Sequence, residues 1–286
     1  CLLSRGLGDV YKRQTHSRLL QLLAGAALSC TASVAQAHFQ LLYVNDTAMH
    51  KAQELEMVAV FTHPFDGGPT MAMGKPLSFS HISSHNGEKT DLLRYLRPVD
   101  WQSRENQARA FRATLPKAMM RALGDHIFVL EPEPYLETEE DLYIQQFTKL
   151  IVNVGGVPGQ WSDTQDLPVD IQPLNKPYAN WTGGVFRARV LADGKPVPFA
   201  QIEVEYLNHG VELDKNAFKP EGEVKSPQPA FNTLSTYSDA EGVVTIGLPR
   251  AGWWGIAALD IGSTKTYKGK ALSQDAVLWI QARDMQ

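Results

Sequence analysis

Residues 184–206 read GVFRARVLADGKPVPFAQIEVEY, and no other stretch indicates the fold as clearly. Residues 192–195 (ADGK) form a tight-turn sequence between two segments rich in strand-forming residues. In the second segment, 201–206 (QIEVEY), polar and apolar residues alternate strictly. A period of two predicts an antiparallel strand with one buried face and one exposed face.

Similar short apolar runs, bounded by turn residues, recur along the chain. These strand candidates lie at 55–61, 77–81, 126–130, 150–154, 184–191, 243–248 and 276–282. Residues 117–123 have the pattern of a short helix stopped by Gly124, and residues 138–149 fit helix or strand. Strands at short intervals with little helix predict an all-β protein.

A change of sequence character near residues 172–177 divides these strands into two groups. We therefore expect two β-sandwich domains, one over residues 38–173 and one over residues 174–286. The many short strands and polar turns of the second domain are typical of an immunoglobulin-like sandwich.

The N-terminal part predicts export. Residues 15–37 contain Arg18, an apolar run and the small-residue triplet Ala35-Gln36-Ala37, which are the parts of a secretory signal peptide. Cleavage after Ala37 would make His38 the first residue of a periplasmic protein. A poor lipobox ending at Cys30 is the alternative, and lipidation there would leave His38 internal. Residues 1–14 resemble translated adapter sequence and do not enter the fold prediction.

The composition after residue 37 excludes several classes of partner. Without residues 1–37, the 27 basic and 31 acidic residues become 23 and 30, a net charge of −7. This acidic balance argues against nucleic acid and anionic membranes as partners. Both cysteines, Cys1 and Cys30, precede His38, so we expect neither disulfides nor thiolate ligands. No later stretch approaches the roughly 18 apolar residues of a membrane span, and we expect no membrane insertion.

The most informative candidate ligand is His38. As a first residue it would offer its α-amine and its imidazole Nδ1, and these two nitrogens can close a six-membered chelate ring on one metal ion. His63 follows a predicted strand directly, in a loop rich in Gly and Pro, where its imidazole can reach a rim of the sandwich. Nitrogen ligands suit Ni, Co, Cu and Zn. The alternative is that His38 follows the cleavage site by chance.

Further candidate ligands lie after His63. Met71 and Met73 form an M-x-M pair that suits Cu(I), although such a pair more often fills a gap in the core. His81 and His85 are spaced to bind zinc from one helix face, but their segment has the pattern of a strand and a turn.

The sequence lacks the motifs of common enzymes. It has no G-x-S-x-G elbow, no H-E-x-x-H helix and no P-loop, so we expect no enzyme activity. One oxidative alternative remains open. A terminal histidine with one further histidine would make a three-nitrogen copper site, as in copper-dependent polysaccharide monooxygenases.

Several segments together resemble a family of exported bacterial proteins. They are Thr62-His63-Pro64-Phe65, Leu130–Tyr135, Lys149 with Val152–Gly156, Asp193–Pro196, Asp239–Gly242 and Pro249–Trp254. The resemblance covers about residues 38–283. Members of this family are often described as the periplasmic component of cobalt/nickel transport systems.

The resemblance implies that the protein takes up or delivers Ni²⁺ or Co²⁺ together with an inner-membrane transporter or an outer-membrane receptor. Carried onto this chain, it implies ligation by the amine and side chain of His38 and by His63. We therefore predict a periplasmic protein that captures nickel or cobalt, with copper as a further possible ion. The alternatives are an adhesion or assembly module that binds protein or glycan without metal, and the copper oxidase.

Overall fold

The structure is a computed structural model that describes residues 38–83 and 87–285. The regular secondary structure in this part of the chain is strand, apart from three short 3-10 helices, and there is no α-helix. The all-β prediction is confirmed. The predicted signal peptide (residues 15–37), Cys30 and His85 lie outside the described residues.

The strands form three sheets. The first sheet contains β1 (Phe39–Tyr43), β3 (Leu55–Thr62), β8 (Gln107–Leu115), β7 (Leu96–Gln102), β18 (Ala217–Gly222) and β17 (His209–Glu212) in that order, with β4 (Thr70–Met71) beside β3. The third sheet contains β12 (Val169–Pro173), β14 (Val185–Ala192), β15 (Lys195–Pro196) and β20 (Val243–Gly247).

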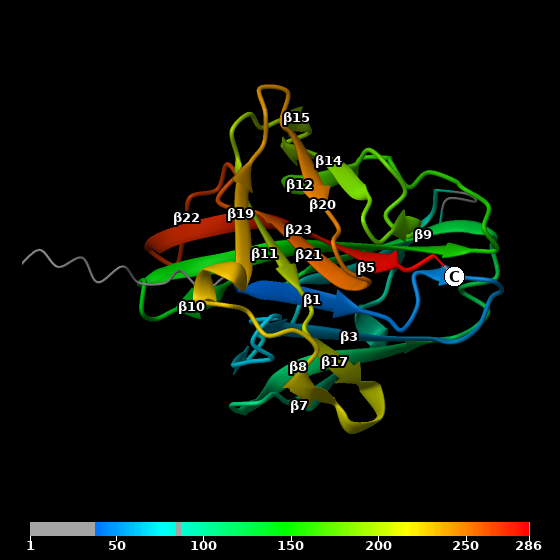
Figure 1. The fold of residues 1–286 in the computed structure, drawn as a ribbon, viewed down its shortest axis with the longest axis horizontal. Helices are drawn as coiled ribbons and strands as arrows, with labels where there is room; N and C mark the ends of the chain where they lie inside the picture. The colour runs from blue at the N-terminus through cyan, green and yellow to red at the C-terminus, as the bar shows by residue number, and fades with distance from the viewer. Residues whose placement is uncertain (1–37, 84–86, 286) are drawn as a thin grey trace, which may run out of the picture. The chain divides into compact units, whose positions relative to one another are not determined.

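The second sheet has twelve strands and lies between the other two. Its main path is β19 (Thr233–Tyr237), β16 (Gln201–Tyr206), β21 (Gly252–Ala258), β23 (Lys270–Arg283), β11 (Leu142–Val154), β9 (Gly124–Glu131), β5 (Ser78–Ser83) and β6 (Lys89–Asp91). Four short strands pair beside this path: β2 (Ala48–Met49), β10 (Tyr135–Glu137), β13 (Asn180–Trp181) and β22 (Thr266–Tyr267). Figure 1 shows β12, β14 and β20 on one side of β11 and β23, and β1, β3, β7 and β8 on the other.

This arrangement gives two sandwiches that share the middle sheet. Along β23, Val277 and Trp279 enter the core facing the first sheet, whereas Leu278 and Ile280 enter the core facing the third. Successive side chains of a strand point to opposite faces, so a strand covered on both sides is apolar without interruption. The predicted boundary between residues 173 and 174 stays a prediction, and strands from both sides of it pair directly, as β11 does with β23.

Two local predictions differ from the structure. Residues 117–120 form a turn rather than a helix, with the N–H groups of Met119 and Met120 bonded to the carbonyls of Pro116 and Lys117. The ambiguous residues 142–149 belong to strand β11. The strand over 201–206 is antiparallel as expected, but Glu203 and Glu205 are buried rather than exposed. The Glu205 carboxylate accepts hydrogen bonds from the N–H of Phe65, in the loop after β3, and from the hydroxyl of Thr233 on β19.

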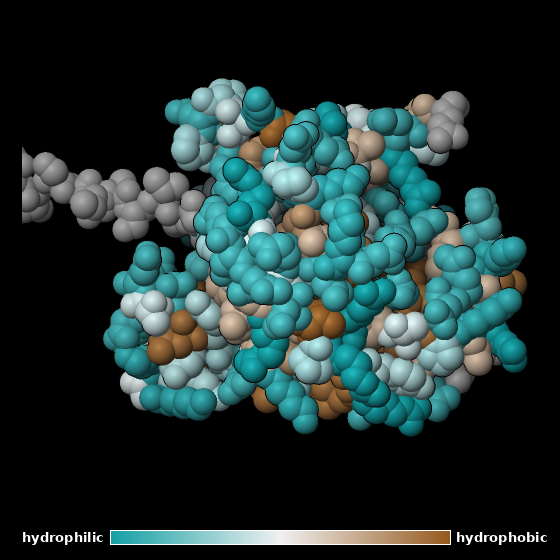
Figure 2. Space-filling model, turned by 90° about the horizontal axis from the view of Figure 1, so that it is seen from below, coloured by the Kyte–Doolittle hydropathy of each residue, from teal (hydrophilic) through white to brown (hydrophobic). Residues whose placement is uncertain are grey.

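The face seen in Figure 2 is mostly hydrophilic, with small separate hydrophobic groups. Among the described residues, no helix has the length and apolar character needed to cross a membrane.

Candidate functional site

The pairing of β1 with β3 places the two predicted histidines together. These strands are antiparallel with Phe39 opposite Thr62, so the preceding residue, His38, comes opposite His63. Directly opposite residues point to the same face of a sheet. The centroids of the two imidazole rings are 4.5 Å apart, with the ring planes at 54°. His38, His63 and the carboxylate described next are called the His38 site below.

Glu137, at the end of β10, orients the His38 ring. Its Oε2 lies 3.1 Å from His38 Nε2. A carboxylate accepts hydrogen bonds, so Nε2 carries a proton, and the neutral form of this imidazole would have its lone pair on Nδ1. Nδ1 is the nitrogen that can form a chelate ring with the α-amine of the same residue. Local sequence did not indicate this role, because Glu137 begins an acidic stretch that resembles solvated surface.

His63 is kept neutral by its surroundings. Its side chain is only 4% exposed. Burial lowers its pKa to about 4, and the neighbouring His38 contributes to the same shift. At neutral pH this imidazole therefore has a lone pair available for a metal ion.

Aromatic and thioether side chains surround the site. Phe61 lies 5.6 Å and Tyr135 lies 6.5 Å from the His38 ring, measured between centroids. A small cavity next to them is lined by Gln40, Phe61, Met73, Gly74, Pro132, Glu133, Tyr135, Ile144 and Gln146. A low-dielectric wall of this kind strengthens electrostatic interactions inside the site.

A buried amide fixes the backbone of His38. Gln146 Nε2 donates to the carbonyl of His38 (2.7 Å), and its Oε1 accepts from the backbone N–H of Gln40 (2.7 Å). The same Nε2 lies 3.2 Å from Oδ2 of Asp275, a buried carboxylate whose pKa is raised by burial. Gln146 thus ties the start of β1 to the middle sheet.

The loop after His63 is anchored at several points. Gly67 and Gly68 donate their backbone N–H groups to the carbonyl of His63. Gly67 has φ +67°, and a Cβ there would lie 2.5 Å from His209 Cγ, so the turn requires glycine. Glu205 Oε2 accepts from the N–H of Phe65 (3.2 Å), and burial raises the pKa of this carboxyl to about 8.

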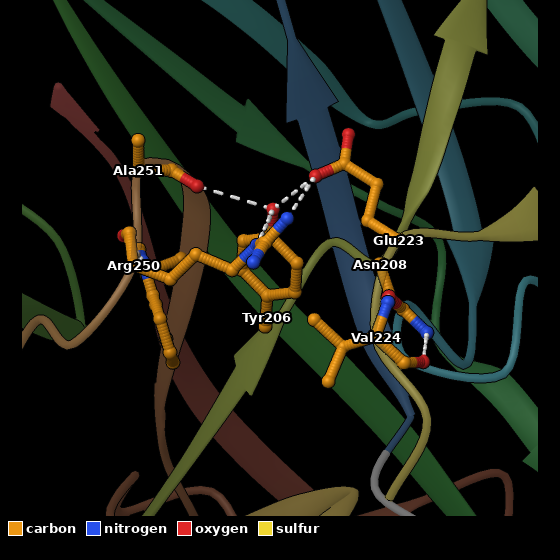
Figure 3. A network of polar contacts seen from close by, with 7 residues as sticks. Tyr206, Asn208, Glu223, Val224, Arg250 and Ala251 are labelled. Atoms are coloured by element: carbon orange, nitrogen blue, oxygen red, sulfur yellow. Dashed lines mark hydrogen bonds and ion pairs between the residues drawn. The ribbon is translucent and has the colours of Figure 1, made fainter. Parts of the chain in front are cut away.

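Asn208 joins the loop to a second segment. Its Nδ2 donates to the carbonyls of Phe65 (3.1 Å) and Val224 (3.0 Å), while its Oδ1 accepts from the N–H of Val224 (2.7 Å). Figure 3 shows this contact beside a second group in which the Tyr206 hydroxyl lies 2.8 Å from Glu223 Oε2. The side chain of Asn208 thus positions the loop that carries His63.

The two methionines lie in the core of the first sandwich. Met71 stands opposite Phe61 in the pairing of β3 with β4, and both Met71 and Met73 are buried. The Met73 sulfur lies 3.6 Å from Gln40 Nε2, next to the His38 site. A ligand role for the two sulfurs stays a prediction.

His81 pairs with His126 instead of lying on a helix with His85. His126 Nε2 lies 2.9 Å from the carbonyl of Ala122, which can only accept, so His126 Nδ1 accepts from His81 Nε2 at 2.8 Å. Burial lowers both pKa values, that of His81 to about 4. These contacts engage three of the four ring nitrogens and favour a structural role for His81.

The described side chains alone do not complete a metal site. Among residues 38–83 and 87–285, no group of three or more His, Cys, Asp or Glu side chains is arranged to hold a metal ion. The His38 site supplies two imidazoles.

The comparisons with known proteins point to one family. A family model described as "Domain of unknown function (DUF4198)" matches residues 35–262. No curated protein matches the sequence.

Solved structures with similar strand arrangements share little sequence. The D0-D1 domain of intimin is 9% identical, covers 86% of this chain and 100% of its own, and gives a TM-score of 0.22. The adhesin InvE of Yersinia pseudotuberculosis is 12% identical over 85% of this chain and 60% of its own, with a TM-score of 0.21. Two fibronectin type III domains of chicken tenascin are 8% identical over 85% and 99%, with a TM-score of 0.22. At these scores the similarities to solved structures indicate no function for this chain.

Proposed function

This chain belongs to the DUF4198 family, and we propose that it is an exported protein that captures Ni²⁺ or Co²⁺ at the His38 site and delivers the ion to a membrane uptake system. The proposal depends on one observation, the 4.5 Å separation of the His38 and His63 rings. The preference for nickel and cobalt comes from the family resemblance described in the sequence analysis.

The ring separation suits two ligands of one ion. Metal–nitrogen bonds are about 2.0–2.1 Å long, so two imidazoles in adjacent coordination positions have centroids roughly 4.5–5 Å apart. The observed 4.5 Å falls in this range. The rings therefore need little rearrangement to bind one ion, which reduces the entropic cost of binding.

The donor set comprises three nitrogens. They are the α-amine and Nδ1 of His38 and one ring nitrogen of His63. Such a set suits late first-row transition metals better than Mg²⁺ or Ca²⁺, which prefer oxygen. The net charge of −7 after residue 37 would also favour the approach of a cation, although salt weakens this attraction.

Isothermal titration of the chain that begins at His38 tests this proposal. We expect one Ni²⁺ site per chain, and we expect His63→Gln to weaken it by at least about a hundredfold, because loss of a ligand costs more than the 10–100-fold typical of an outer-shell partner. The control is His50→Gln, since His50 is exposed. Equal binding by the His63→Gln variant would contradict the proposal.

The affinity should fall as the pH falls. An α-amine has a pKa of about 7.7–8.0, so below that range its proton competes with the metal and lowers the apparent affinity by about tenfold per pH unit. His63, with its pKa near 4, adds no competition until the pH approaches that value. Titrations at a series of pH values measure the slope, and a flat profile between pH about 7.5 and about 5.5 would exclude the amine as a ligand.

Copper is the second candidate ion, because the same three nitrogens would bind Cu²⁺ and Tyr135 lies near His38. The oxidase alternative is tested by incubating the copper-loaded protein with a reductant and a panel of polysaccharides. Release of oxidised oligosaccharides would favour this alternative over metal delivery.

A further inference from the structure

A pocket lies at the corner where the chain passes from the middle sheet to the first sheet. The 3-10 helix η1 (Leu93–Tyr95) makes this passage, between β6 and β7. The pocket has a volume of about 310 Å³. This volume lies at the lower end of the range of about 300–1,000 Å³ that is usual for small-molecule sites. The residues that line the pocket are Lys75, Pro76, Leu93, Leu96, Pro98, Arg109 and Phe111.

Most of the pocket wall is apolar. Phe111, which is 6% exposed, stands opposite Pro98 in the pairing of β7 with β8, so both side chains lie on the same face of the sheet. Leu93 and Leu96 are half-buried, and Pro76 is buried. A ligand that covers the exposed parts of these side chains would remove apolar surface from water. The pocket therefore favours a ligand with an apolar body.

The other two lining residues are cations. Arg109 Nε donates to the carbonyl of Met73 (2.6 Å), and this hydrogen bond fixes the position of the guanidinium group. Among residues 38–83 and 87–285, no carboxylate forms an ion pair with Arg109 or Lys75, although Asp100 stands opposite Arg109 on β7. The terminal nitrogens Nη1 and Nη2 of Arg109 can therefore donate to a ligand.

Charge complementarity indicates that the ligand carries an anionic group. Residues 91–100, which include η1, together with Lys75 and Arg109 contain four basic and two acidic residues. This local excess of positive charge contrasts with the net charge of −7 of the chain after residue 37. A basic region on an otherwise acidic protein concentrates anions at that place.

We propose that this corner pocket binds a small carboxylic acid with an aromatic or aliphatic body. The body lies against Phe111, Leu96 and Pro98, and the carboxylate lies between Lys75 and Arg109. The N–H groups of a guanidinium match the two oxygens of a carboxylate in geometry, and the resulting hydrogen bonds are charge-assisted. The inference is independent of the proposed metal site, because no residue that lines this pocket belongs to the His38 site.

Isothermal titration of the metal-free chain that begins at His38 tests the proposal, with octanoate and phenylpropionate as probes. We expect one saturable site per chain for both acids. Butyrate should bind at least about tenfold more weakly than octanoate, because it buries four fewer methylene groups. Octanol should also bind at least about tenfold more weakly than octanoate, because it has the apolar body but lacks the charge that Arg109 and Lys75 would bind.

Two variants locate the carboxylate. Arg109→Gln should weaken octanoate binding by at least about tenfold, because it removes charge-assisted hydrogen bonds. Lys75→Gln, which changes an exposed residue, should weaken binding by about two- to fivefold, the effect of one exposed ion pair. The matched control is Arg121→Gln, which removes the same charge from an exposed arginine that does not line the pocket, and it should bind octanoate as tightly as the wild type.

Circular dichroism confirms that each variant is folded. The proposal is overturned if neither acid gives a saturable site, or if octanol binds as tightly as octanoate. It is equally overturned if the Arg109→Gln and Lys75→Gln variants both bind octanoate as tightly as the wild type.

Discussion

Replacing Lys149 by Met should destabilise the protein by about 3–5 kcal/mol, the typical cost of removing one partner from a buried ion pair. Lys149 on β11 is 2% exposed and Asp170 on β12 is 3% exposed, with 2.5 Å between Nζ and Oδ1. The substitution would leave the Asp170 carboxylate buried with only the backbone N–H of Gln165 as a hydrogen-bond donor to Oδ2. Thermal unfolding should show a decrease in Tm of roughly 10 °C.

Two further variants make this test specific. The double variant Lys149→Met with Asp170→Leu removes both charges and should regain most of the lost stability. Lys265→Met breaks an exposed pair with Asp260 and should change the free energy of unfolding by no more than about 1 kcal/mol. A Lys149→Met variant as stable as the wild type would show that the pair does not stabilise the junction between the second and third sheets.

Adding one methionine before His38 should weaken nickel binding by more than about a hundredfold, even though every side chain of the site remains. The extension converts the α-amine into an amide, which removes one nitrogen and opens the chelate ring. Loss of an outer-shell partner alone costs about 10–100-fold in affinity, and loss of a ligand should cost more.

Glu137→Gln provides the matched comparison. Gln can still accept a hydrogen bond from His38 Nε2 through its amide oxygen but lacks the charge of the carboxylate. We expect about a tenfold loss of affinity for this variant, at the low end of the effect of an outer-shell change. If the extended chain binds as tightly as the processed chain, the α-amine is not a ligand.

The sequence predicted where strands form better than it predicted which of their faces are buried. The alternation over 201–206 showed which residues share a face, but it could not show that Glu203 and Glu205 are buried. Alternation reports how side chains are divided between two faces, and burial depends on partners distant in sequence. The uninterrupted run at 276–280 was the clearer sign of a strand covered on both sides.

The candidate site was predicted in part. Residue type and the expected cleavage after Ala37 selected His38, and a loop position selected His63. Their proximity follows from the antiparallel register of β1 and β3. Glu137 and Gln146 could not be found from local sequence, because β10 and β11 bring them to His38 from about a hundred residues away. A pairing this distant in sequence leaves no periodic signal in either segment.

A crystal of the processed chain loaded with Ni²⁺, with diffraction measured at the nickel absorption edge, would locate the ion directly. We predict one anomalous peak per chain, within bonding distance of the α-amine and Nδ1 of His38 and of a ring nitrogen of His63. A peak at any other position, or none between these two residues, would contradict the proposed site.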